Sequence, residues 1–150
     1  MTTVREMVDD AKSRIDNLSM EEVEAERHEG KAMLIDVRDV RELWREGKIP
    51  GARHVPRGML EFWADPESEY HKDFMKPDAR VILYCAGGLR SALAADALNR
   101  LGYSDVAHLD IGFDEWKRRG GEVAEVPQKR SVISSLMYLP CAAPTWLCSA

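Results

Sequence analysis

One cysteine of the chain stands where a protein can make it a nucleophile. Cys85 follows the apolar run 81–84 and precedes a short loop, 86–91, and then an Ala- and Leu-rich stretch. A strand, a loop and a helix in that order aim backbone N–H groups and the positive end of a helix dipole at the sulfur. We therefore expect the thiol to ionise more easily, and the thiolate is the nucleophilic form. The alternative is a small buried hydrophobic residue, and the glycines and arginine that follow argue against it.

The loop after this cysteine suits the binding of a small anion. Gly87 and Gly88 allow a tight curve, because a Cβ there would be strained at positive φ or would block approach. Arg90 could bind an anionic substrate with its planar fork of donors. Ser91 either caps the helix that follows or hydrogen-bonds to the loop, and we expect the cap. The backbone N–H groups that could stabilise the sulfur belong to Ala86, Gly87, Gly88, Leu89, Arg90 and Ser91.

A polar pair follows an earlier apolar run. Asp36 and Arg38 stand at the carboxyl end of residues 33–37. They could contact a substrate. Alternatively, they could form an ion pair that connects the strand ends to the loop after Cys85, and we expect this structural role. Asp36 could then accept hydrogen bonds from the loop and hold its shape. Arg38 and Glu42 stand four residues apart, a spacing that also suits a simple local salt bridge.

Strands alternate with helices along most of the chain. This order predicts an α/β fold with a mainly parallel sheet that is flanked by helices on both faces. Ligands of such sheets bind at the carboxyl ends of the strands, which is where Cys85 falls. The expected strands are residues 33–37, 53–55, 81–84 and 106–109. The expected helices are residues 4–16, 20–29, 40–46, 91–101 and 113–119, with a helical turn near 59–63.

The composition is that of an ordinary globular protein of one domain. The chain has 150 residues, of which 45% are hydrophobic and 31% charged, and its net charge is -5. This acidic balance, with no basic stripe, argues against a nucleic-acid partner. We find neither a signal-peptide core nor a run of ~18 apolar residues, so we expect no membrane partner. Three cysteines imply no disulfide framework, and we expect a reducing, cytoplasmic location.

The histidines give no sign of a metal centre. The four are His28, His54, His71 and His108, and they lack the spacing of metal ligands. We therefore expect neither a metal nor another cofactor. His54 and His108 lie in or beside short expected strands, and we expect both to be structural residues with satisfied hydrogen bonds.

Three segments occur together in an order and spacing that resemble a known family. They are residues 34–38 with Glu42 and 47–52, residues 85–91 with Ala94 and Ala95, and residues 109–116 with 121–123. On these segments the chain resembles the single-domain rhodaneses, a family of sulfurtransferases, over roughly residues 18–124. Two positions depart from the family pattern. Lys48 replaces the usual His, and Ile111 stands where a glycine is common, but both positions look structural.

The resemblance implies a rhodanese-like fold and a sulfur-transfer reaction. Cys85 would take a sulfane sulfur from a donor such as thiosulfate, become a persulfide, and pass the sulfur to cyanide or a thiol. One alternative is a sulfur-relay or protein-binding module that exchanges sulfur with a protein partner and has little activity on small donors. Another is a phosphatase or arsenate reductase of related loop design. Those phosphatases have one more residue between Cys and Arg, which makes room for a tetrahedral oxyanion, so we expect this function least.

The ends of the chain lie outside the resemblance. We expect an N-terminal helical extension at 1–17, the rhodanese-like domain at 18–125, and an apolar C-terminal tail at 126–150. The tail could pack on the domain, contact a partner or mediate a dimer, so the sequence leaves the oligomeric state open. Cys141 and Cys148 could act as resolving thiols for a persulfide, although a peripheral thiol is more often inert and that is what we expect.

Overall fold

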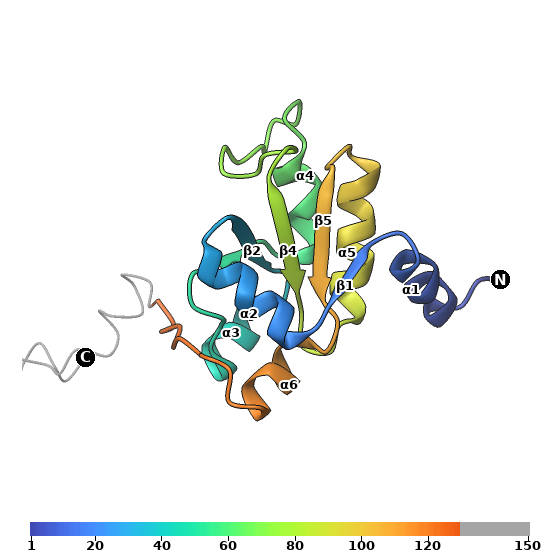
Figure 1. Ribbon diagram of the computed structural model, residues 1–150. Helices are drawn as coiled ribbons and strands as arrows, with labels where there is room; N and C mark the ends of the chain where they lie inside the picture. The colour runs from blue at the N-terminus through green and yellow to red at the C-terminus, as the bar shows by residue number, and fades with distance from the viewer. Residues whose placement is uncertain (130–150) are drawn as a thin grey trace, which may run out of the picture.

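The computed structural model describes residues 1–129, in which a five-stranded sheet with strand order β1-β5-β4-β2-β3 forms the centre (Figure 1). All four strand pairs are parallel. The strands are β1 (Asp16–Leu18), β2 (Ala32–Asp36), β3 (Arg53–His54), β4 (Arg80–Tyr84) and β5 (Asp105–Leu109). The helices are α1 (Val4–Lys12), α2 (Met20–Glu29), α3 (Val40–Glu46), α4 (Leu60–Ala64), α5 (Leu89–Arg100) and α6 (Gly112–Arg118), with a 3₁₀ turn at Arg57–Met59.

Side chains of the central strands alternate between two apolar cores, one on each face of the sheet. On β4, Val81 and Leu83 belong to the core under α4 and α5, whereas Ile82 and Tyr84 belong to the core under α2 and α6. In Figure 1, α4 and α5 accordingly lie on the other side of the sheet from α2. Strands buried on both faces are typical of parallel sheets. The predicted α/β fold with helices on both faces is confirmed.

The N-terminal segment differs from the prediction. The helix expected at 4–16 ends at Lys12, and residues 16–18 form the edge strand β1, which pairs with β5. This strand has three residues, of which only Leu18 is buried. It is therefore too short to show the alternation of apolar and polar residues by which a strand is recognised in a sequence. Instead, α1 packs against α5, where Arg14 forms a bidentate ion pair with Asp96.

The remaining elements match the expected order, and their ends follow from local chemistry. Ser19 and Glu22 form the predicted capping box at the start of α2, and Gly30 ends that helix in the left-handed conformation. Within residues 1–129, no helix combines the length and apolar character that a membrane crossing requires. Most of the predicted tail, with Cys141 and Cys148, lies outside the described residues.

Candidate active site

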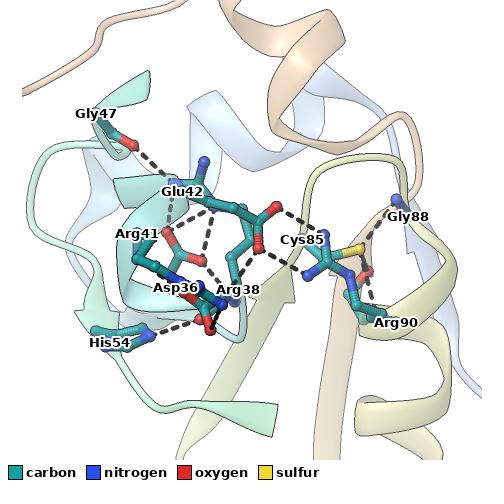
Figure 2. Close-up of polar contacts among 11 residues, drawn as sticks. Asp36, Arg38, Arg41, Glu42, Gly47, His54, Cys85, Gly88 and Arg90 are labelled. Carbon is teal, nitrogen blue, oxygen red and sulfur yellow. Dashed lines mark hydrogen bonds and ion pairs between the residues drawn. The ribbon is translucent and has the colours of Figure 1, made fainter. Parts of the chain in front are cut away.

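The loop after β4 surrounds the sulfur of Cys85 at the carboxyl edge of the sheet. The Sγ atom accepts hydrogen bonds from the backbone N–H of Gly88 at 3.1 Å and of Ser91 at 3.3 Å (Figure 2). Cys85 is 1% exposed, so these donors act away from bulk water. Two of the six loop N–H groups thus contact the sulfur, fewer than the sequence suggests. Donors aimed at Sγ favour its charged form, which is the nucleophile.

The two loop glycines have different roles. Gly88 has a φ of +89°, and a Cβ there would collide with the carbonyl oxygen of Asp110. Gly87 has no positive φ, and a Cβ there would meet no atom within 4 Å. The prediction that glycine is required for a tight curve therefore holds at Gly88 and is wrong at Gly87, which faces open space.

Ser91 is not the cap of the helix. Helix α5 begins at Leu89 with Gly88 as its N-cap, so Ser91 lies inside the first turn. The predicted helix starts two residues too late, because the loop closes within three residues of Cys85. The Ser91 Oγ is instead 3.5 Å from Cys85 Sγ and 2.9 Å from Nδ1 of His108. The alternative role, a hydrogen bond within the loop, is the correct one.

The start of α6 holds the other side of the loop. The backbone N–H of Phe113 donates to the carbonyl of Cys85 at 2.8 Å, and that of Asp114 donates to the carbonyl of Ala86 at 3.1 Å. Gly112 has a φ of +80°, and a Cβ there would collide with the Ala86 carbonyl. This close approach explains why glycine is present at 112 while Ile111 can replace the other glycine of the family pattern.

Asp36 and Arg38 form a buried ion pair beside the loop. Arg38 Nη2 lies 2.7 Å from Asp36 Oδ2, and the two side chains are 1% and 0% exposed. The same nitrogen also donates to the carbonyl of Gly47 at 2.7 Å, and the guanidinium lies 4.2 Å from the ring centroid of Phe113. Burial disfavours the charged guanidinium, but the hydrogen bonds and charge of Asp36 outweigh it, so the pKa of Arg38 is raised.

The bonds of Asp36 thus go to Arg38, and its oxygens receive none of the bonds shown from the loop of Cys85 (Figure 2). The expected ion pair is present, but the expected hydrogen bonds from the loop to Asp36 are not among the contacts of the described residues. Instead, Arg38 connects the strand end to the start of α6, which in turn holds the loop.

Arg90 forms a second ion pair, at the surface of the loop. Its Nη1 and Nη2 atoms lie 2.9 and 3.0 Å from the two carboxylate oxygens of Glu42 on α3. The hydrogen bonds of this pair raise the pKa of Arg90 and lower that of Glu42. The side chains are 43% and 20% exposed. The proposed salt bridge between Arg38 and Glu42 is therefore wrong, since Glu42 reaches across to the loop arginine.

A pocket of about 500 Å³ opens beside Ala86, between α3 and α6. Its wall carries both signs of charge. The basic residues lining it are Arg38, Arg45, Lys117 and Arg118, and the acidic ones are Glu42, Glu46 and Asp114. Within residues 1–129, no group of three His, Cys, Asp or Glu side chains is placed to hold a metal ion.

Residues 19–119 match the family model of the rhodanese-like domain. The chain belongs to this family. The match spans the Cys85 loop, the Asp36–Arg38 pair and the start of α6, and so covers the segments on which the resemblance is based, apart from residues 121–123. Both the family and the α/β fold predicted from the sequence are thereby confirmed.

Related sequences and structures include an uncharacterized protein and a sulfurtransferase. YqhL of Bacillus subtilis, an uncharacterized protein, is 36% identical over 93 residues, which cover 62% of this chain and 64% of YqhL. The chain thus spans somewhat less than two thirds of this curated relative. The human single-domain sulfurtransferase TSTD1 has a similar structure, with a TM-score of 0.62, 25% identity, and coverage of 70% of this chain and 97% of that protein.

A further solved structure is more similar still in sequence. It is a Rhodopseudomonas palustris protein of unknown function, RPA3614, described as a possible tyrosine phosphatase. It has a TM-score of 0.80 and 42% identity, and the match covers 83% of this chain and 96% of that protein. The fold of this chain is therefore shared with proteins that are described by two different chemistries.

Sequence reasoning missed two neighbours of the loop. The sequence suggests Arg38 as a possible partner of Glu42, because a spacing of four residues is visible in the sequence and a contact across space is not. His108 was expected to be a structural residue, although it lies next to Ser91. The signal for His108 was its position near the carboxyl end of a strand that neighbours the Cys85 strand, where Leu83 and His108 are paired in register.

Proposed function

We propose that this protein is a sulfurtransferase that carries a sulfane sulfur on Cys85. The observation that carries the proposal is the environment of Sγ. Inside a rhodanese-like domain, this atom accepts hydrogen bonds from the backbone N–H groups of Gly88 and Ser91. Backbone donors aimed at one sulfur favour a thiolate and can equally stabilise a charged persulfide. The sulfurtransferase name of the human structural relative supports the same reaction class.

The reaction proceeds in two displacements on sulfur. The Cys85 thiolate attacks the outer sulfur of thiosulfate, a new S–S bond forms, and sulfite leaves with the electron pair of the broken bond. An acceptor such as cyanide or a thiolate then attacks the outer sulfur of the persulfide. The Cys85–sulfur bond breaks, thiocyanate or a new persulfide leaves, and the Cys85 thiolate is restored. Neither step needs a metal or another cofactor.

Arg90 is the candidate binding group for an anionic donor, together with the open side of the loop at Gly87. Because Glu42 accepts from Arg90 in the free protein, an anionic donor must compete with that carboxylate. The exposure of the Arg90 side chain makes such an exchange feasible without unfolding. We propose that donor binding replaces or loosens the Glu42 contact.

A sulfur-relay function is the second candidate, and the Glu42–Arg90 pair favours it. A guanidinium that is already paired attracts a small dianion less strongly than a free one. A protein persulfide would instead bring its own contacts and would not depend on that attraction. Fast transfer from a protein persulfide, beside a high KM for thiosulfate, would distinguish this function from a thiosulfate-dependent one.

Phosphatase activity is a third candidate, which the description of the Rhodopseudomonas relative supports. The loop of this chain has only four residues between Cys85 and Arg90, and two of its N–H groups contact the sulfur itself. A loop of this size suits a single sulfur atom better than a phosphate. Hydrolysis of an aryl phosphate, with no sulfur transfer, would favour the phosphatase over the sulfurtransferase.

The expected cytoplasmic location stays a prediction.

Steady-state kinetics with thiosulfate and cyanide test the proposal. Thiocyanate formation should follow a ping-pong pattern, with parallel lines in double-reciprocal plots, and should be lost in Cys85→Ala. Cys141→Ser and Cys148→Ser variants are the matched controls and should retain the activity. Intersecting lines, or full activity of Cys85→Ala, would contradict a covalent intermediate on Cys85.

A further inference from the structure

A chain of polar contacts leads from the exposed Asn17 at the sheet edge to the buried sulfur of Cys85. His108 lies at its centre and is fully buried on β5. Its Nε2 atom is 2.8 Å from Oδ1 of Asn17 on β1, and its Nδ1 atom is 2.9 Å from Oγ of Ser91 on α5. Ser91 Oγ in turn is 3.5 Å from Cys85 Sγ. The sulfur is thus two hydrogen bonds away from a buried imidazole.

The contacts of Asn17 determine which nitrogen of His108 carries a proton. The Nδ2 group of Asn17 donates to the carbonyls of Lys12 at 2.9 Å and of Ile15 at 3.2 Å. This fixes the orientation of the amide, so its oxygen, which can only accept, faces Nε2. Nε2 therefore donates, and in the neutral ring Nδ1 is left as an acceptor.

The imidazole is neutral at ordinary pH. Burial lowers the pKa of His108 to about 4, an effect that the nearby Asp110 opposes and Lys12 reinforces. Asp110 Oδ1 lies 3.5 Å from Nε2 and is itself paired with Lys12 at 2.9 Å, so its charge is largely matched. Arg90, whose charge interacts with Cys85, is paired with Glu42.

A neutral His108 with an accepting Nδ1 decides what the Ser91 hydroxyl can do. The hydroxyl has one proton, which goes to Nδ1, so its oxygen is left to face the sulfur as an acceptor. An acceptor beside Sγ stabilises the protonated thiol of Cys85. The backbone N–H groups of Gly88 and Ser91 act in the opposite direction, because they stabilise the thiolate.

We propose that His108 is a positioning residue that holds the Ser91 hydroxyl turned away from the sulfur, and so sets the fraction of Cys85 that is ionised. The proposal rests on Cys85 being the nucleophile of the proposed function. This role would favour the reaction, because an over-stabilised thiolate is a weaker nucleophile. The best attacking thiol ionises near the ambient pH. His108 offsets part of the stabilisation that the loop N–H groups provide.

The test is a pH titration of the Cys85 thiolate in the full chain, followed by its ultraviolet absorbance. The spectrum of a Cys85→Ala chain is subtracted, which removes the other cysteines and the tyrosines. In His108→Leu the Ser91 hydroxyl is free to donate to the thiolate, so the titration midpoint should fall by about one pH unit. His108→Asn is the matched control, since its side-chain oxygen can replace Nδ1 as acceptor, and its midpoint should stay near that of the native chain.

A double-mutant cycle shows whether His108 acts through Ser91. In a Ser91→Ala background the hydroxyl is gone, so adding His108→Leu should leave the midpoint unchanged. A fall of the same size in both backgrounds would overturn the proposal, because His108 would then act through general packing. A midpoint that rises, or does not move, in His108→Leu alone would overturn it as well.

Nitrogen NMR of the native chain provides a test that does not depend on the folding of any variant. The His108 ring should be the neutral Nε2–H tautomer at neutral pH, and a proton on Nδ1 would refute the proposal. Neither measurement uses a sulfur donor. A protein without sulfurtransferase activity could still show the predicted titration, and an active one could fail to show it, so the two failures are distinguishable.

Discussion

Two carboxylate–guanidinium pairs flank the same loop, and they differ chiefly in exposure. The Asp36–Arg38 pair is almost fully buried, and its guanidinium also binds the Gly47 carbonyl and packs on Phe113. The Glu42–Arg90 pair has similar distances, but its arginine side chain is 43% exposed. Figure 2 shows the two pairs next to each other, with Arg90 beside Cys85.

The difference indicates which charge can take part in binding. A buried arginine with several fixed partners cannot leave its carboxylate without leaving an unpaired charge in the protein interior. An exposed arginine can exchange a carboxylate for a substrate anion at little cost, because water replaces each lost bond. We therefore propose that the buried pair supports the loop and that the exposed pair is the one that can bind an anion.

Removing one partner from each pair should separate them most clearly. Asp36→Ala leaves the Arg38 charge buried and alone, so the free energy of unfolding should fall by about 3–5 kcal/mol. Glu42→Gln is the matched control, because it removes the charge of the exposed pair but keeps an acceptor for the Asp39 N–H at the start of α3, and it should cost under about 1 kcal/mol. Urea unfolding of both variants measures the difference. Equal losses would show that exposure does not distinguish the two pairs.

The pH dependence of the free energy of unfolding tests the burial of His108, which contacts the loop through Ser91. The unfolded chain binds a proton on His108 near pH 6.5, whereas the folded protein binds it only near pH 4. The contribution of His108 is therefore complete above pH 6.5 and is lost as the pH falls through about 4.

Relative to His108→Asn, which cannot titrate, the native chain should lose about 3 kcal/mol across this range. Chemical unfolding at a series of pH values measures it. Parallel stability curves for the two chains would show that folding does not change the pKa of His108, contrary to the effect expected from its burial.

The same contrast between a packed and an open position recurs within the loop. Gly88→Ala places a side chain at a φ of +89° and against the Asp110 carbonyl, so it should destabilise the protein by about 1–3 kcal/mol or more. Gly87→Ala enters open space and should change stability by no more than about 0.5 kcal/mol. Thermal unfolding of the two variants compares them. A Gly87→Ala loss as large as that of Gly88→Ala would contradict the loop geometry.

The smallest expected effect lies on the exposed pair and concerns binding. Glu42→Gln removes the charge that competes for Arg90, so the KM for thiosulfate should fall by about two- to fivefold at low salt, with little change in kcat. Glu46→Gln is the matched control, because Glu46 lines the same pocket but pairs with Lys117. An equal fall in both variants would indicate a general charge effect, and an unchanged KM in Glu42→Gln would count against exchange at Arg90.

The sequence predicts what local order and residue type determine. The alternation of strands and helices, the position of Cys85 and the family could all be recognised, because each depends on runs of neighbouring residues. The ion pair of Asp36 with Arg38 could be anticipated for the same reason, since the two residues are close in the sequence.

What the sequence could not predict depends on contacts between distant segments. The strand β1 is too short for a period, and its place follows from pairing with β5. Glu42 meets Arg90 across 48 positions, and His108 meets Asn17 across 91. The start of α5 was misplaced because Gly88, rather than a serine, caps the helix. In each case the deciding partner is visible only once the sheet has brought the segments together.

Intact-protein mass spectrometry after brief incubation with thiosulfate tests the central claim most directly. The native chain should gain about 32 Da, the mass of one sulfur, and should lose it again when cyanide is added. Cys85→Ala should show no gain. A gain that persisted in Cys85→Ala would move the sulfur to Cys141 or Cys148, and the absence of any gain on the native chain would contradict a persulfide formed from thiosulfate on Cys85.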